Sequence, residues 1–147
     1  MSSAVTLPPA HQPVGTYVGA VRTGNQIWIS GQGPTWGSEL RFTGKVGGDL
    51  SLDQGREAAR LTALNLLAQA AALLEGDLSR VRRCVKLFGL VNAAPGFNEP
   101  HLVINGASDQ ITEVLGPDAG PHARAAVCAS SLPFAIAVEL DAVFEVA

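Results

Sequence analysis

The strongest constraint on the fold is a strict alternation of apolar and polar residues near the C-terminus, in segment 120–144. Side chains of a β-strand point alternately to its two faces, so a period of two indicates strands. We expect two strands joined by a turn, with one face of the second strand apolar: Ile136, Val138, Leu140 and Ala142. A symmetrical hairpin turning between Ser131 and Leu132 would place Arg124 directly opposite Glu139.

This pairing of Arg124 with Glu139 has two interpretations. Facing charges on neighbouring strands form salt bridges, which contribute about 0.2 to 1 kcal/mol when exposed. A guanidinium and a carboxylate among small residues also suit a site for a small charged molecule. Spacing alone favours the salt bridge, and a bulge at Pro133 would shift the register.

The chain between residues 15 and 92 carries the signals of four strands and one helix. A hairpin with a Gly24–Asn25 turn is predicted over residues 17–30, with a short strand near residues 40–42. Ser51 begins a capping box, so a helix is expected to start there and to end at Gly76. A long buried strand is predicted over residues 81–92.

A second helix is predicted after this strand, with Asn98 as its cap and Pro100 in its first turn. Gly106 lies in its middle, which indicates close packing against a neighbour. The resulting order defines an α+β fold, a mostly antiparallel sheet with two helices on one face. The other face, which is expected to carry Arg124, Glu139 and Asp141, would meet water or another subunit.

Length and composition predict a single domain, residues 1–147, that begins with a proline-containing arm at residues 1–14. Hydrophobic residues make up 47% against 16% charged, an apolar excess that favours a surface covered by partner subunits. The net charge of -3 argues against nucleic acid as a partner. We expect no membrane span and no signal peptide, and reduced Cys84 and Cys128 fit a cytoplasmic location.

The sequence carries no recognisable metal or cofactor motif. His11, His101 and His122 lie on separate elements without ligand spacing, so each is expected to be structural or on the surface. The glycines at 44–48 precede no Gly-Lys-Ser/Thr, so they predict no phosphate loop. We therefore expect neither metal nor cofactor.

Several short motifs occur together in an order that is specific as a set. They are Gly15-Thr16-Tyr17, Ile29-Ser30-Gly31-Gln32, Ala123-Arg124-Ala125, Leu132-Pro133 and Val138-Glu139-Leu140-Asp141. With them the chain resembles the RidA/YjgF/UK114 family of reactive intermediate deaminases, which has the chorismate-mutase-like fold. Runs 103–109 and 120–124 resemble a branch that carries the label endoribonuclease L-PSP.

The resemblance implies a homotrimer with a barrel-like core and active sites at the subunit interfaces. Family members hydrolyse reactive 2-imino acids to 2-oxo acids and ammonia without a cofactor. By position, Arg124 would clamp the substrate carboxylate and Glu139 would hold the attacking water. The residues that would line the pocket are Tyr17, Ser30, Gly31 and Asn105.

The sequence departs from the family pattern at several positions. Thr16 replaces a usual proline, Ala126 a frequent cysteine and Ser131 a frequent arginine, and the segment between Asn105 and Arg124 is longer than usual. These changes affect the pocket and leave two alternatives to an imine hydrolase. One is an endoribonuclease or RNA-binding protein, disfavoured by the negative charge and by 5% aromatic content. The other is a sensor that binds small carboxylates without turnover.

Overall fold

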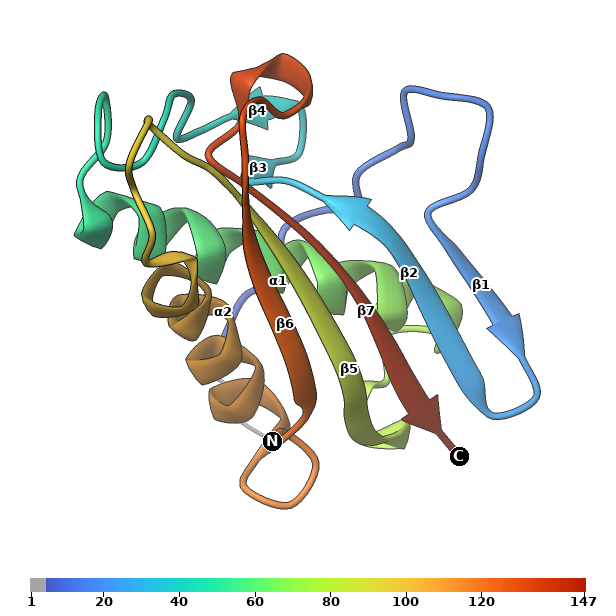
Figure 1. Ribbon diagram of the computed structural model, residues 1–147. Helices are drawn as coiled ribbons and strands as arrows, with labels where there is room; N and C mark the ends of the chain where they lie inside the picture. Colours follow the sequence, from blue (N-terminus) through green and yellow to red (C-terminus); the bar gives the residue numbers. More distant parts are fainter. Residues whose placement is uncertain (1–4) are drawn as a thin grey trace.

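A single five-stranded sheet with two helices on one face organises the chain (Figure 1). The computed structural model describes residues 5–147, so residues 1–4 of the predicted arm, and the part of the signal-peptide prediction that concerns them, lie outside it. The strands are β1 (Ala20–Thr23), β2 (Gln26–Gln32), β3 (Thr35–Trp36), β4 (Glu39–Leu40), β5 (Val81–Asn92), β6 (Ala123–Ala129) and β7 (Val138–Val146). The helices are α1 (Leu52–Leu73) and α2 (Pro100–Leu115), and the strand order is β1-β2-β7-β5-β6.

Local signals placed most of these elements correctly. Strand β5 spans the predicted residues 81–92, and β1 and β2 form the predicted hairpin with Thr23 paired to Gln26. Strand β1 begins at Ala20, later than the expected residue 17. The short strand expected near residues 40–42 is a two-stranded unit, β3 with β4, that turns at Gly37.

Helix α1 begins where its cap predicts and ends at Leu73, three residues before the predicted Gly76. The Ser51 hydroxyl accepts a hydrogen bond from Gln54 N at 3.1 Å, and Gln54 Oε1 accepts one from Ser51 N at 2.9 Å. This reciprocal pair satisfies two backbone N–H groups that the first turn leaves without partners. At the other end Gly76 adopts φ +85°, a conformation that glycine adopts without steric cost.

Helix α2 lies against α1 with their backbones in contact. A Cβ on Gly106 would lie 3.1 Å from the carbonyl carbon of Arg56 and closer still to its oxygen, so the predicted close packing is confirmed. The predicted cap at Asn98 is wrong by one residue: Glu99 is the N-cap, and its side chain makes no capping hydrogen bond. Pro100 occupies the first turn, where a missing N–H costs nothing.

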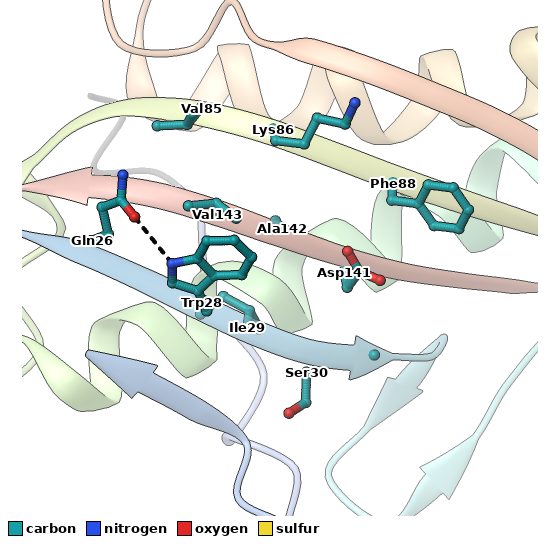
Figure 2. A pocket seen from close by; sticks show the side chains of 11 residues that line it. Gln26, Trp28, Ile29, Ser30, Val85, Lys86, Phe88, Asp141, Ala142 and Val143 are labelled. Atoms are coloured by element: carbon teal, nitrogen blue, oxygen red, sulfur yellow. Dashed lines mark hydrogen bonds between the residues drawn. The ribbon is translucent and has the colours of Figure 1, made fainter. Parts of the chain in front are cut away.

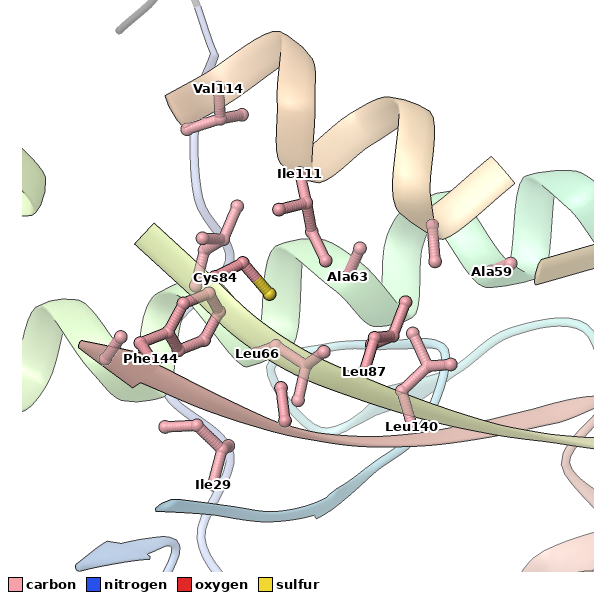
Figure 3. Close-up of a cluster of buried hydrophobic side chains, with 14 of the residues drawn as sticks. Ile29, Ala59, Ala63, Leu66, Cys84, Leu87, Ile111, Val114, Leu140 and Phe144 are labelled. Atoms are coloured by element: carbon pink, nitrogen blue, oxygen red, sulfur yellow. The ribbon is translucent and has the colours of Figure 1, made fainter. Parts of the chain in front are cut away.

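The core lies between the two helices and one face of the sheet (Figure 3). Phe144 and Leu87 point from the sheet toward Leu66 of α1 and Ile111 of α2, and all four are fully buried. Each such side chain contributes about 1.5 to 3 kcal/mol through burial. Cys84 belongs to this core, and burial raises the pKa of its thiol to about 12, so it stays protonated. No helix among residues 5–147 is long and apolar enough to cross a membrane.

The predicted hairpin between the last two strands is wrong. Strand β6 pairs in parallel with β5, whereas β7 pairs antiparallel with the other edge of β5 and with β2. Parallel neighbours need a long crossover connection, and α2 supplies it between β5 and β6. Because β5 lies between β6 and β7, segment 130–137 crosses the end of β5 and does not form a tight turn (Figure 1).

Candidate functional site

Arg124 lies on edge strand β6 and points toward α2. Its Nη1 donates to Asn105 Oδ1 at 2.8 Å and to Ser108 Oγ at 3.2 Å, and its Nη2 donates to the His101 carbonyl at 3.2 Å. The structure thus brings Asn105 and Arg124 together. A guanidinium has five N–H donors, and these contacts use three, which leaves two for a carboxylate.

A second layer of hydrogen bonds holds the serine that contacts Arg124. His122 Nδ1 lies 2.7 Å from the Gly120 carbonyl, so this nitrogen carries the proton and donates. The other ring nitrogen, Nε2, lies 2.9 Å from Ser108 Oγ and accepts the hydroxyl proton in the neutral ring. Ser108 thereby presents its lone pairs to Arg124. Sequence reasoning missed Ser108 as a partner of Arg124. Its position three residues after Asn105 places the two side chains on one face of α2 and could have revealed it.

Glu139 lies on the opposite face of the sheet from Arg124. Arg124 pairs with Leu87 of β5, while Glu139 pairs with Leu90, three residues along. Residues an odd number apart along a strand point to opposite faces, and Leu87 is in the core. The expected pairing of Arg124 with Glu139 within one chain, and the placement of Arg124 on the open sheet face, are therefore wrong.

The Glu139 carboxylate is held close to β2. A Cβ on Gly31 would lie 3.0 Å from Glu139 Oε2, so only glycine leaves this space free. Partial burial of the carboxyl group, and secondarily repulsion by the Asp141 carboxylate, raise the pKa of Glu139 above its ordinary value. A raised pKa makes the ionised carboxylate a stronger base at neutral pH.

Glu139 borders a cavity of about 280 Å³. Its lining residues are His11, Val14, Gly15, Tyr17, Gly31, Gln32, Gly33, Thr35, Leu40, Pro133, Phe134, Ile136 and Glu139. Tyr17, Gly31 and Glu139, three of the residues expected in the pocket, line this one cavity, and none of the lining residues the structure describes is a lysine or arginine. Sequence reasoning did not single out Phe134, which follows the recognised Leu132-Pro133 motif directly.

A wider cavity of about 580 Å³ lies on the face of the sheet that the helices do not cover (Figure 2). Trp28, Phe88 and Asp141 rise into it from three neighbouring strands, and burial raises the pKa of Asp141. Ser30, expected in the substrate pocket, borders this cavity, and its hydroxyl donates to the Val18 carbonyl at 2.6 Å. Trp28 is 54% exposed although it is large and apolar, which is typical of a surface that another chain covers.

Metal-ligating side chains are scattered over the described part of the chain. Within residues 5–147, no three His, Cys, Asp or Glu residues lie close enough together to hold a metal ion. Cys84 and Cys128 are both free thiols.

The chain has two helices on one face of a mostly antiparallel sheet, and charged residues on the opposite face and at the β6 edge. This architecture is the chorismate-mutase-like fold. The sequence matches the family described as "YjgF/chorismate mutase-like, putative endoribonuclease" over residues 1–144. The chain therefore belongs to the RidA/YjgF/UK114 family.

Relatives at moderate identity cover nearly the whole chain. Protein TCP17 of Trypanosoma cruzi is 45% identical over 141 residues, which is 96% of this chain and 88% of that protein. The crystal structure of Atu1372 from Agrobacterium tumefaciens, a protein of unknown function, is 47% identical with a TM-score of 0.91, covering 98% of this chain and 87% of that one.

Two further structures share the fold. A "putative endoribonuclease" from Shewanella oneidensis is 29% identical with a TM-score of 0.91, covering 97% of this chain and 93% of that one. TdcF of E. coli, whose structure contains bound serine, is 20% identical with a TM-score of 0.65, covering 95% and 94%.

Proposed function

We propose that this protein hydrolyses 2-imino acids to 2-oxo acids and ammonia, at a site formed between two copies of the chain in a homotrimer. One copy contributes Arg124, and the next contributes Glu139 with the cavity beside it. The observation that carries the proposal is the separation of these two groups. Each is prepared for a ligand, yet in a single chain they lie on opposite faces of the sheet.

The two halves complement each other chemically. The Glu139 cavity offers a base, but no lysine or arginine among its described lining residues, so it lacks a permanent positive charge for a substrate carboxylate. Arg124 has two N–H donors left over and stands on an edge strand, where a second chain has access. The exposed apolar residues on the open sheet face supply a surface for the association.

The reaction follows from these positions. Arg124 binds the carboxylate through two parallel hydrogen bonds and so orients the imine carbon toward Glu139. Glu139 takes a proton from water as the water oxygen bonds to that carbon, and the electrons of the C=N bond move to nitrogen. The proton held by Glu139 passes to that nitrogen, which gives a carbinolamine. Loss of the hydroxyl proton then forms the C=O bond as the C–N bond breaks, and the nitrogen, which gains that proton, leaves as ammonia. General-base assistance of this kind accelerates reactions by typically ~10² to 10⁴-fold.

TdcF adds limited support, because a protein of the same fold holds serine, a small amino acid with a carboxylate. We further propose that the protein acts in the cytoplasm, where both cysteines stay reduced, and that it needs neither metal nor cofactor.

Mixing two inactive variants tests the shared site. Arg124→Ala and Glu139→Gln are each expected to lose most turnover of a freshly generated 2-imino acid. If they are unfolded together and refolded into mixed trimers, some interfaces combine Arg124 from one copy with Glu139 from the other, and activity should return. Refolding each variant alone is the control. Mixed trimers that stay inactive, although light scattering shows that they assembled, would refute the shared site.

Cleavage of RNA is the second candidate function, and the family description itself favours it. It predicts loss of full-length RNA at low salt, with a rate that falls steeply as salt is added. Two results together would favour this candidate: the wild-type protein degrades RNA but hydrolyses no imine, and the Arg124→Ala variant does not degrade RNA. A sensor would bind 2-oxo acids but turn over neither substrate.

A further inference from the structure

The cavity beside Glu139 has an apolar wall that the hydrolysis itself does not require. Val14, Leu40 and Phe134 line it, and the same three residues also line an adjoining cavity of about 160 Å³. All three are exposed to solvent, and Phe134 is 67% exposed. An apolar wall that runs from the base into a second cavity provides room for a substrate side chain.

Phe134 is held in an unfavourable backbone conformation. Its φ is +59° and that of Ala135 is +57°, so two consecutive residues with a Cβ occupy the left-handed region. This region is unfavourable for a residue with a Cβ, so the conformation persists only where the surroundings enforce it. Strain that keeps an aromatic side chain exposed indicates a role for that side chain.

Neighbouring segments fix this conformation through the three residues that follow Phe134. Gly44 N donates to the Ala135 carbonyl at 2.8 Å, and Ala137 N donates to the Phe42 carbonyl at 3.0 Å. Asn92, which is buried, donates from Nδ2 to the Ile136 carbonyl at 3.1 Å and accepts from Lys45 Nζ at 3.0 Å. The segment is therefore a fixed wall.

We propose that Phe134, with Val14 and Leu40, binds the side chain of the imino acid and selects large apolar side chains, branched aliphatic or aromatic, over a methyl group. The inference rests on the proposed function, because it assigns a substrate class to that site. The charge of the cavity agrees with it. An acidic side chain would be repelled by Glu139, and a small polar one would leave the apolar wall in contact with water.

The test compares two substrates in wild-type protein and three variants. An amino-acid oxidase generates the imines of leucine and alanine, and kcat/KM is measured for each. We expect wild-type protein to prefer the leucine imine by about 10- to 200-fold. Phe134→Ala should lower that preference at least tenfold, whereas Phe134→Leu should keep most of it. Leu73→Ala, which removes an exposed leucine at the end of α1, is the matched control and should leave the preference unchanged.

Binding separates failure of this inference from failure of the proposed function. Calorimetry with 4-methyl-2-oxopentanoate and pyruvate measures the same preference without turnover. If no imine is hydrolysed but the larger acid binds more tightly and Phe134→Ala removes the difference, the subsite stands and the hydrolase does not. Equal rates and equal affinities for both side chains would overturn the subsite. So would a Phe134→Ala protein that is monomeric by light scattering, because Phe134 would then belong to the subunit interface.

Discussion

Replacing Gly106 by alanine tests whether backbone contact between α1 and α2 sets both stability and the position of Arg124. The new Cβ would lie 3.1 Å from the carbonyl carbon of Arg56, and carbon atoms pack best at about 3.5 to 4.0 Å. The obstacle is backbone, which cannot rotate away, so the helices must separate by roughly 0.5 to 1 Å. Overpacking of this kind costs about 1 to 3 kcal/mol or more.

Helix propensity opposes this cost. Because the obstacle is backbone, the overpacking cost lies in the upper part of that range, about 2 to 3 kcal/mol. Alanine is favoured over glycine inside a helix by about 1 kcal/mol, so we expect a net destabilisation of about 1 to 2 kcal/mol. For a chain of this size that corresponds to a fall in Tm of about 2 to 8 °C. Asn105 and Ser108 flank the substituted position and hold Arg124, so affinity for a 2-oxo acid should fall as well.

Thermal unfolding at one fixed protein concentration provides the assay. The control is Asp109→Ala, which makes a comparable gain in helix propensity on the exposed side of α2 and should not lower Tm. A Gly106→Ala protein with a Tm equal to or above that of the wild type would show that the two helices separate without cost, contrary to the packing described above.

Three further predictions concern the site and the assembly. Ser108→Ala should raise KM by about three- to tenfold with little change in kcat, because Arg124 loses one of its supports, and Ser108→Thr should restore KM. Asp141→Asn should lower the pKa of Glu139, because it removes a repelling charge. The acidic limb of the pH profile of kcat/KM should then move to lower pH. An unchanged limb would exclude Glu139 as the base. The same variant should change stability. A carboxyl group whose pKa is raised in the folded protein favours folding at acid pH and loses that contribution as pH rises, so Asp141→Asn should raise Tm at neutral pH and leave it unchanged at acid pH. Trp28→Glu should convert the proposed trimer to monomers in light scattering, and a trimer that persists would show that this face is not the interface.

Signals that act within a few residues were enough to predict much of the fold. The reciprocal Ser51–Gln54 cap involves residues three apart, and Gly106 revealed a close approach because helices otherwise disfavour glycine. Family motifs likewise brought Tyr17, Gly31 and Glu139 to one cavity. The exact cap of α2 was missed because several residues before Pro100 are compatible with that role.

Strand pairing could not be predicted from such signals. A hairpin is the usual arrangement of two successive strands, and the spacing of Arg124 and Glu139 happened to suit one. The actual partner of β6 is β5, which lies more than thirty residues earlier in the chain. An alternation of apolar and polar residues identifies a strand but does not specify which other strand pairs with it. The placement of Phe134 was equally hidden, because its left-handed backbone depends on contacts with segments 42–45 and 92.

The position of β5 between β6 and β7 has a consequence for how homologous sequences can diverge. From Lys86 to Val91 its side chains meet the core on one face and the open surface on the other, in register with both neighbours. Inserting or deleting one residue inside β5 would exchange the two faces along both pairings at once. We therefore expect changes in length to be confined to connections such as 41–51, 116–122 and 130–137. The last of these carries Phe134, so substrate range can evolve there while the sheet keeps its pairing.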